Sequence, residues 1–206
     1  MHLLKIYLVL LLILSSMSCA TVSPQQQLNY EGNKAYLSGR YQEALRGYEK
    51  TLEVANKNKD QQYIAIAMYG LGRTNIKLCR LDEAEKWLKQ SIIVREKVAD
   101  NDEAKITQNI SELARLYKAQ QRYLEANVLF ERSLPLLYQM KADHSDPIEL
   151  ANHLDEYEKS LHQTGRLSEA DVIAIKSSEL RQNNPGKIAL YSPDPIPQSC
   201  FISSGQ

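Results

Sequence analysis

Glu149 and His153 come nearest to a catalytic or metal-binding pair in this sequence of 206 residues. They are four residues apart, which would place both on one face of a helix, and carboxylate and imidazole groups are both zinc ligands. No third ligand stands within reach in the sequence. The sequence also lacks a glycine-rich phosphate loop, a nucleophile-elbow phrase and a paired-cysteine motif. We therefore predict no catalytic residues, no metal site and no cofactor.

The N-terminal residues are predicted to direct export. Lys5 precedes an unbroken apolar run, Ile6 to Leu14, and small residues follow the run up to Ala20. The order basic, apolar, small is typical of a secretory signal peptide. The run is shorter than the ~20 apolar residues that a membrane-spanning helix needs. Residues 1–19 are therefore assigned to a signal peptide.

Cys19 is the candidate for covalent modification. Ser18-Cys19 resembles the end of a bacterial lipobox, although Ser16 stands where the lipobox prefers leucine. The resemblance implies an acylated Cys19 at the mature N-terminus, and Ala20 in place of an aspartate implies the outer membrane, with the protein facing the periplasm. The alternative is cleavage after Ala20, because Ser18-x-Ala20 also fits the small-x-small rule. That product would be soluble in the periplasm or secreted.

The remaining cysteines are not expected to form a disulfide. Disulfide frameworks normally show more cysteines in a smaller chain. Cys79 falls where a repeat requires a small residue, so we expect it to be buried. Cys200 lies in a polar, proline-rich tail, residues 184–206. No nearby residue in the sequence supports a role for it as a reactive or pairing thiol.

Composition favours helices and argues against nucleic acid as a partner. Lys plus Arg and Asp plus Glu both number 25, whereas nucleic-acid binding draws on an excess of basic residues. Gly and Pro are scarce, at 8 and 7 residues, and good helix formers fill the middle of the chain.

One short phrase, Arg-(Tyr or Leu)-x-Glu-Ala, occurs four times. Its alanines are spaced 84−44 = 40, 126−84 = 42 and 170−126 = 44 residues apart. Such regular recurrence indicates a repeat protein. The four copies begin at Arg40, Arg80, Arg122 and Arg166.

The residues around each phrase predict a hairpin of two helices. The repeats carry mostly small residues twelve and five places before the alanine, and mostly a large apolar residue four places after it. Small residues would let two helices approach closely, and the large residue would fill the space between hairpins. The positions five before the alanine are Gly39, Cys79, Gln121 and Gly165. The phrase's Glu would lie in the first turn of the second helix, where its charge opposes the helix dipole.

This pattern resembles the tetratricopeptide repeat (TPR), and its long period resembles the kinesin-light-chain type. Asp143-His144-Ser145-Asp146-Pro147 matches the linker of that type, and Leu113-Ala114-Arg115-Leu116-Tyr117 matches the family's first helix. The resemblance implies an all-α solenoid of antiparallel helix-turn-helix hairpins in a right-handed superhelix. Residues 20–26 would form a linker to the repeats, which span 27–183. The four hairpins would cover about 27–57, 61–98, 103–141 and 147–183. Pro135, inside the last helix of the third hairpin, is expected to end or kink that helix near Ser133.

The first helices of such hairpins line a concave groove, which is the candidate binding site. Positions read from the register place basic residues along its centre and tyrosines at one end. Arg73, Arg115 and Lys159 occupy equivalent places in three units and would form a row of positive charge. That row would suit an acidic peptide segment as ligand. The alternative is a set of solvated charges with no single ligand. The candidate groove residues are Asn33, Tyr36, Tyr69, Arg73, Arg115, Lys118 and Lys159.

The sequence therefore predicts an exported, lipid-anchored scaffold that binds other proteins at the cell envelope, as in secretion or pilus assembly. Self-association through the same groove is possible on this reading. The first alternative is a soluble exported protein with the same binding role. A second, of another class, is an accessory subunit or weak enzyme acting on cell-wall material.

Overall fold

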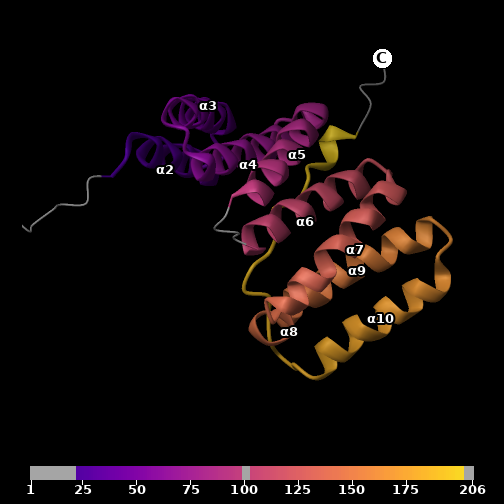
Figure 1. Cartoon of the computed structure of the whole chain (residues 1–206). Helices are drawn as coiled ribbons and strands as arrows, with labels where there is room; N and C mark the ends of the chain where they lie inside the picture. The colour runs from indigo at the N-terminus through magenta and orange to yellow at the C-terminus, as the bar shows by residue number, and fades with distance from the viewer. Residues whose placement is uncertain (1–21, 99–102, 202–206) are drawn as a thin grey trace, which may run out of the picture.

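The computed structural model describes residues 22–98 and 103–201, and within them the chain forms nine α-helices and one short 3-10 helix (Figure 1). Those residues contain no strand, so the predicted all-α architecture of repeated hairpins is confirmed. The predicted signal peptide and Cys19 lie outside the described residues. The helices are α2 (Pro24–Leu37), α3 (Tyr41–Asn58), α4 (Gln61–Lys77), α5 (Leu81–Lys97), α6 (Glu103–Ala119), α7 (Tyr123–Gln139), α8 (Ala142–Ser145), α9 (Pro147–Gln163), α10 (Leu167–Gln182) and η1 (Gln198–Cys200).

The helices pair in chain order into four hairpins, α2–α3, α4–α5, α6–α7 and α9–α10, and successive hairpins stack. Each second helix packs on the first helix of the next hairpin, while α2 contacts α4 and α4 contacts α6. The first helices α2, α4, α6 and α9 therefore follow one another along one side of the stack, called here the first-helix face. Within the described residues, no helix combines the length and apolarity that crossing a membrane would require.

The four phrase alanines form the tight contacts of the stack. Ala44, Ala84, Ala126 and Ala170 have no exposed surface. The helices around them approach closely: a Cβ added to Gly47 of α3 would lie 2.8 Å from the Cα of Gly32 in α2. Large side chains four residues after the alanine fill the space between hairpins, since Tyr48, Leu88 and Phe130 are fully buried.

The positions five before each alanine differ from prediction. Gly39, Cys79, Gln121 and Gly165 do not sit at a helix contact; each occupies the turn between the two helices of its hairpin with φ of 72°, 57°, 60° and 73°. This left-handed conformation satisfies the last carbonyl groups of the first helix, and glycine adopts it without steric cost. Cys79 is therefore exposed, and the prediction that it is buried was wrong.

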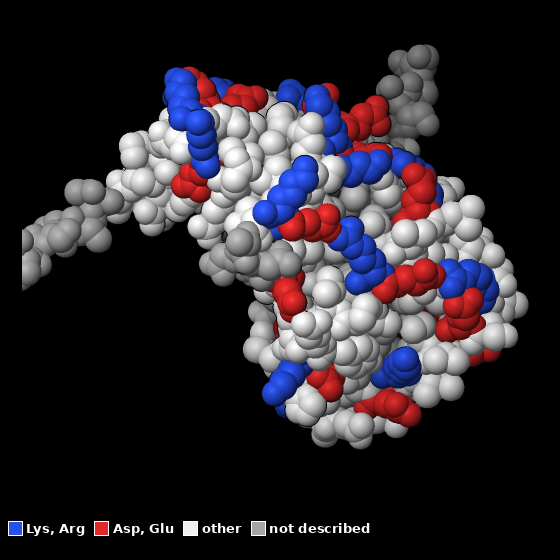
Figure 2. Space-filling model, in the orientation of Figure 1, with Lys and Arg blue, Asp and Glu red and all other residues white. Residues whose placement is uncertain are grey.

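The arginine of the phrase links neighbouring repeats. In the third and fourth hairpins it pairs with the Glu three residues later, as Arg122 does with Glu125, and also reaches the preceding hairpin. Arg122 contacts Glu85, and Arg166 contacts Glu131. Burial alone would raise the pKa of Glu85, but hydrogen bonds from Arg122, Lys89 and Tyr117 lower it to about 2. Basic and acidic side chains accordingly lie next to one another over much of the visible surface (Figure 2).

The linker before the fourth hairpin has its own structure. Residues 142–145 form the single turn α8, and Asp146 caps α9 by accepting a hydrogen bond from the backbone N–H of Glu149 at 3.2 Å. Pro147 is the first residue of α9. A backbone N–H at that position has no partner within the helix, so proline is tolerated there. Pro135 does not end α7, which continues to Gln139.

Candidate binding groove on the first-helix face

The C-terminal tail of the protein lies on the first-helix face (Figure 1). From the end of α10 it passes the start of α9, then α6 and α4. Ile188 and Leu190 are both 81% exposed, and the tail turns back toward the N-terminal half of the chain.

Three points of contact hold the tail. The side-chain Oδ2 of Asp146 accepts hydrogen bonds from the backbone N–H groups of Leu190 and Tyr191, both at 3.0 Å. The hydroxyl of Tyr36 in α2 donates to Asp194 at 2.7 Å. Lys77, the last residue of α4, donates to the carbonyl of Pro195 at 2.7 Å.

A disulfide closes the far end of the tail. Cys79, in the turn between α4 and α5, is bonded to Cys200, in η1, across 121 residues of sequence. The two Cα atoms lie 4.9 Å apart, a normal separation for a disulfide. Ile196 packs against the main hydrophobic core just before this link. The expectation that the two cysteines remain unpaired was wrong, because the tail's path brings them together.

Three of the predicted groove residues form one cluster at the N-terminal end of the face. The guanidinium of Arg73 lies 3.9 Å from the centre of the Tyr36 ring and donates to the side-chain oxygen of Asn33 at 2.7 Å. It also donates to the hydroxyl of Tyr48 at 2.9 Å. Tyr69, a further predicted residue, lies beside Arg73 with its ring centre 5.7 Å away.

Tyr36 stands between a cation and an anion: Arg73 covers its ring and Asp194 accepts from its hydroxyl. Burial and the hydrogen bond to Asp194 raise the pKa of Tyr36 far above its usual value, so the phenol remains a donor. Asp194 is the one acidic residue between Asn184 and Phe201. Through Tyr36, the tyrosine end of the predicted groove thus contacts one acidic side chain of the tail.

The other predicted basic residues lie further along the face, each in a different setting. Arg115 of α6 is nearly buried and pairs with Glu112 at 3.0 Å. Lys118 pairs with Glu156 of α9 at 3.5 Å, and Lys159 is exposed on α9. In the predicted row of positive charge, Arg115 is thus paired with a carboxylate, whereas the acceptors of Arg73 are the neutral oxygens of Asn33 and Tyr48.

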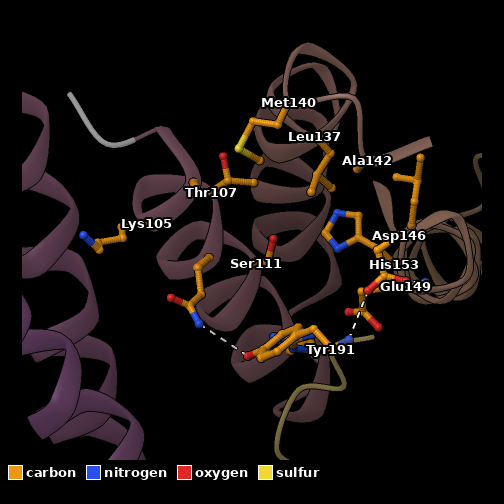
Figure 3. Close-up of a pocket in the computed structure, with 14 residues that line it drawn as sticks. Lys105, Thr107, Ser111, Leu137, Met140, Ala142, Asp146, Glu149, His153 and Tyr191 are labelled. Atoms are coloured by element: carbon orange, nitrogen blue, oxygen red, sulfur yellow. Dashed lines mark hydrogen bonds between the residues drawn. The ribbon is translucent and has the colours of Figure 1, made fainter. Parts of the chain in front are cut away.

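A pocket of about 330 Å³ lies beside Tyr191, between α6, the end of α7 and the start of α9 (Figure 3). Apolar side chains such as Leu137 and Met140 line it together with Ser111, Glu149 and His153. Burial raises the pKa of Glu149 to about 7.

His153 in that pocket is a core residue. Its Nε2 lies 2.9 Å from the hydroxyl of Ser133, and its ring packs edge-on to Phe130. Burial, assisted by the charge of Arg115, lowers its pKa to about 3, so the imidazole is neutral at physiological pH. Glu149 and His153 do share the pocket, but the described residues hold no group of three or more His, Cys, Asp or Glu side chains arranged for a metal ion.

Comparison with known families identifies the repeat. A family model described as "Tetratricopeptide repeat" matches residues 32–97 and 63–139, which together cover more than half of the chain. The chain belongs to the tetratricopeptide-repeat family. No curated protein sequence matches it significantly.

Solved structures resemble it in fold. BtubC (BKLC) from P. vanneervenii superposes with a TM-score of 0.72 at 18% identity, over 87% of this chain and 71% of that one. A putative kinesin light chain from Podosopora anserina, with nearly identical TPR-like repeats, gives 0.62 at 16% identity, over 85% and 84% of the two chains. At these identities the likeness shows the fold alone. The predicted kinesin-light-chain-like TPR fold is thereby confirmed, and it is the fold of a protein-interaction scaffold.

Several residues of this face were missed by sequence reasoning. Tyr48, Lys77 and Asp146 carry no motif that marks them as contacts of the tail or of Arg73. The one available signal for Cys79 was its place in a turn: the same register position holds glycine in two other repeats, which points to a left-handed, exposed residue.

Proposed function

We propose that this TPR protein is an exported, lipid-anchored scaffold that holds partner proteins at the outer membrane and binds them through the first-helix face. The observation that carries the binding role is the tail itself: this face already accommodates an extended peptide, residues 190–197, followed by the short helix η1. Tyr36, Lys77 and Asp146 contact it through hydrogen bonds to one side chain and several backbone groups. Such contacts suit an extended segment of another protein equally well.

Two features support export. The first is the signal-like arrangement of residues 1–19. The second is the Cys79–Cys200 disulfide, because disulfides persist in oxidising compartments outside the cytoplasm and are rare inside it.

The anchoring step is tested by intact-mass measurement on protein isolated from its native envelope. A diacylglyceryl group on an N-terminal Cys19 is the expected result. A free Thr21 N-terminus would replace this proposal with the alternative of a soluble periplasmic or secreted protein.

The binding face is tested by site-directed photo-crosslinking in the native envelope. A photoreactive residue at Lys118, on the first-helix face, should capture a partner protein. The matched control places it at Val172, which is exposed on α10, a second helix at the end of the stack. Capture from position 172 with none from position 118 would move the binding site off the first-helix face.

The alternative of another class, an accessory subunit or weak enzyme acting on cell-wall material, would use Glu149 and His153. We expect purified protein to leave peptidoglycan fragments unchanged, because His153 is buried and bound by Ser133. Turnover that is lost in a variant combining Glu149→Ala with His153→Ala would contradict the scaffold proposal.

A further inference from the structure

The tail's attachment to the first-helix face is uneven along its length. Its N-terminal part follows α10 directly, and its C-terminal part is fixed covalently at Cys79. Between these two points Ile188 and Leu190 have largely exposed side chains, and Asp194 and Pro195 are exposed residues that each make one hydrogen bond to the face. Asp146 and Gln108 bond to residues 190 and 191, and Ile196 is the one apolar residue of the segment that packs against the main core.

The non-covalent contacts alone are weak. Hydrogen bonds at partly exposed positions contribute little net stability, because water satisfies the same groups when the tail leaves. The disulfide at the far end changes this, because it keeps the tail close to the face. The tail residues between α10 and Cys200 are then held at a high effective concentration near their binding partners. The disulfide therefore decides whether residues 190–200 stay on the face.

Cys79 is placed where a reductant can reach it. It lies in an exposed turn at the end of α4, whereas Cys200 is half-buried. The equivalent turn positions of the other repeats hold Gly39, Gln121 and Gly165, so the turn itself has no need of a thiol. The cysteine serves the link to the tail.

We propose that the Cys79–Cys200 disulfide locks the C-terminal tail onto the first-helix face as a built-in occupant, and that reduction opens this face to a partner segment of the same chemistry. That segment is extended and carries an aromatic residue followed three residues later by an aspartate, as Tyr191 and Asp194 do. The part of the proposal that concerns the partner rests on the proposed function; the lock itself does not.

The reductant is a dithiol. One of its thiolates attacks the sulfur of Cys79, the S–S bond breaks, and Cys200 leaves as a thiolate that takes up a proton. The second thiol of the reductant then attacks the mixed disulfide and releases Cys79. The products are two protein thiols and one oxidised, cyclic reductant, so two electrons and two protons pass to the protein.

Amide hydrogen exchange on the full mature chain tests the lock directly. The N–H groups of Leu190 and Tyr191, both bonded to Asp146, report whether the tail is seated. We expect their exchange to accelerate at least tenfold when dithiothreitol is added. The Cys79→Ser, Cys200→Ser double variant should exchange at the fast rate with or without dithiothreitol. Equal exchange rates in oxidised and reduced wild type would overturn the proposal.

A peptide-binding assay tests whether the face opens. The probe is a fluorescein-labelled synthetic peptide of residues 187–201 with Cys200→Ser, followed by anisotropy. We expect at least tenfold weaker binding to oxidised wild type than to the double-serine variant. Adding Tyr191→Ala and Asp194→Asn to that variant weakens the resident tail and should tighten probe binding further.

The outcomes separate the two proposals. Equal binding to the oxidised protein and the double-serine variant, or binding to neither, would refute the lock while leaving the scaffold role to the crosslinking experiment. Opening of the face together with failure of crosslinking from position 118 in the Cys79→Ser, Cys200→Ser variant would refute the proposed binding site and keep the lock. A circular dichroism spectrum unchanged by the cysteine substitutions ensures that both assays compare folded proteins.

Discussion

Tyr36 donates a hydrogen bond to Asp194 across 158 residues of sequence, joining the first hairpin to the end of the tail. Removing the hydroxyl in Tyr36→Phe leaves the buried ring against Arg73 and removes this bond. We expect a loss of about 1 kcal/mol in unfolding free energy. Exchange at the Leu190 and Tyr191 amides should also accelerate. Tyr30→Phe, at an exposed position of the same helix, is the control and should change neither measurement.

The contact alanines should tolerate no enlargement. Ala126 has no exposed surface, so Ala126→Leu should overpack the third hairpin and cost about 1–3 kcal/mol or more. The neighbouring change Glu125→Gln removes an exposed ion pair with Arg122 and should cost under about 1 kcal/mol. Thermal melts that ranked the two variants in the opposite order would contradict the repeat register.

The hairpin turns offer a stabilising change. Gln121 holds φ at 60°, a conformation that costs an L-residue about 1–2 kcal/mol, and glycine removes that cost. After allowing for the greater flexibility of glycine in the unfolded chain, Gln121→Gly should stabilise the protein by about 0.5–1 kcal/mol.

Gly39→Ala is the matched reverse of that change. Its φ is 72° and no atom lies within 4 Å of the added Cβ, so backbone strain alone should make it destabilising. Denaturant melts measure both variants. If Gln121→Gly destabilised the protein, the glutamine side chain would contribute more to the free energy of unfolding than its backbone strain costs.

Glu149 should make stability depend on pH. Its pKa in the folded protein is about 7, above its value of about 4.3 in an unfolded chain, because burial disfavours the carboxylate. The folded state therefore binds more protons in this range, and the contribution of Glu149 to stability falls as pH rises from about 4.5 to about 7. Asp146 and Glu156 also raise the pKa, whereas Arg115 of α6 lowers it.

Glu149→Gln removes that pH dependence, and urea melts between pH 4 and pH 8 measure it. His153 acts in the opposite direction: its pKa is lowered to about 3, so its contribution to stability is lost as pH falls from about 6.5 toward 3. Because His153 is present in both proteins, the difference between wild type and Glu149→Gln isolates the glutamate. A difference that did not change with pH would show that Glu149 ionises normally.

The fold could be predicted because its signals are local and repeated. Ala44 and its three counterparts recur at nearly constant spacing, and each unit of two helices needs only its neighbours to bury its apolar side. The turn residues were misassigned because a small side chain suits both a helix contact and a left-handed turn. Gln121, which is neither small nor apolar, was the residue that distinguished the two.

The surroundings of Arg73 were predicted in part. The register correctly grouped Asn33, Tyr36 and Arg73, since equivalent positions of stacked first helices lie side by side. It could not reveal that Tyr48, from a second helix, and Asp194, from the tail, complete the group. Contacts with the tail depend on the path of a segment outside the repeats, which no periodicity encodes. The Cys79–Cys200 disulfide was missed for the same reason.

The Cys79–Cys200 disulfide also determines how mechanical tension passes through the protein. A pull between the N-terminus and a point beyond Cys200 would load α2, α3 and α4 and then cross directly from residue 79 to residue 200. The residues between the two cysteines, with α5 to α10, would carry no load. Their extended length is on the order of 400 Å. In the oxidised protein α5 and the last two hairpins are thus shielded from stretching, and the first hairpin together with α4 is the part of the molecule that yields under force.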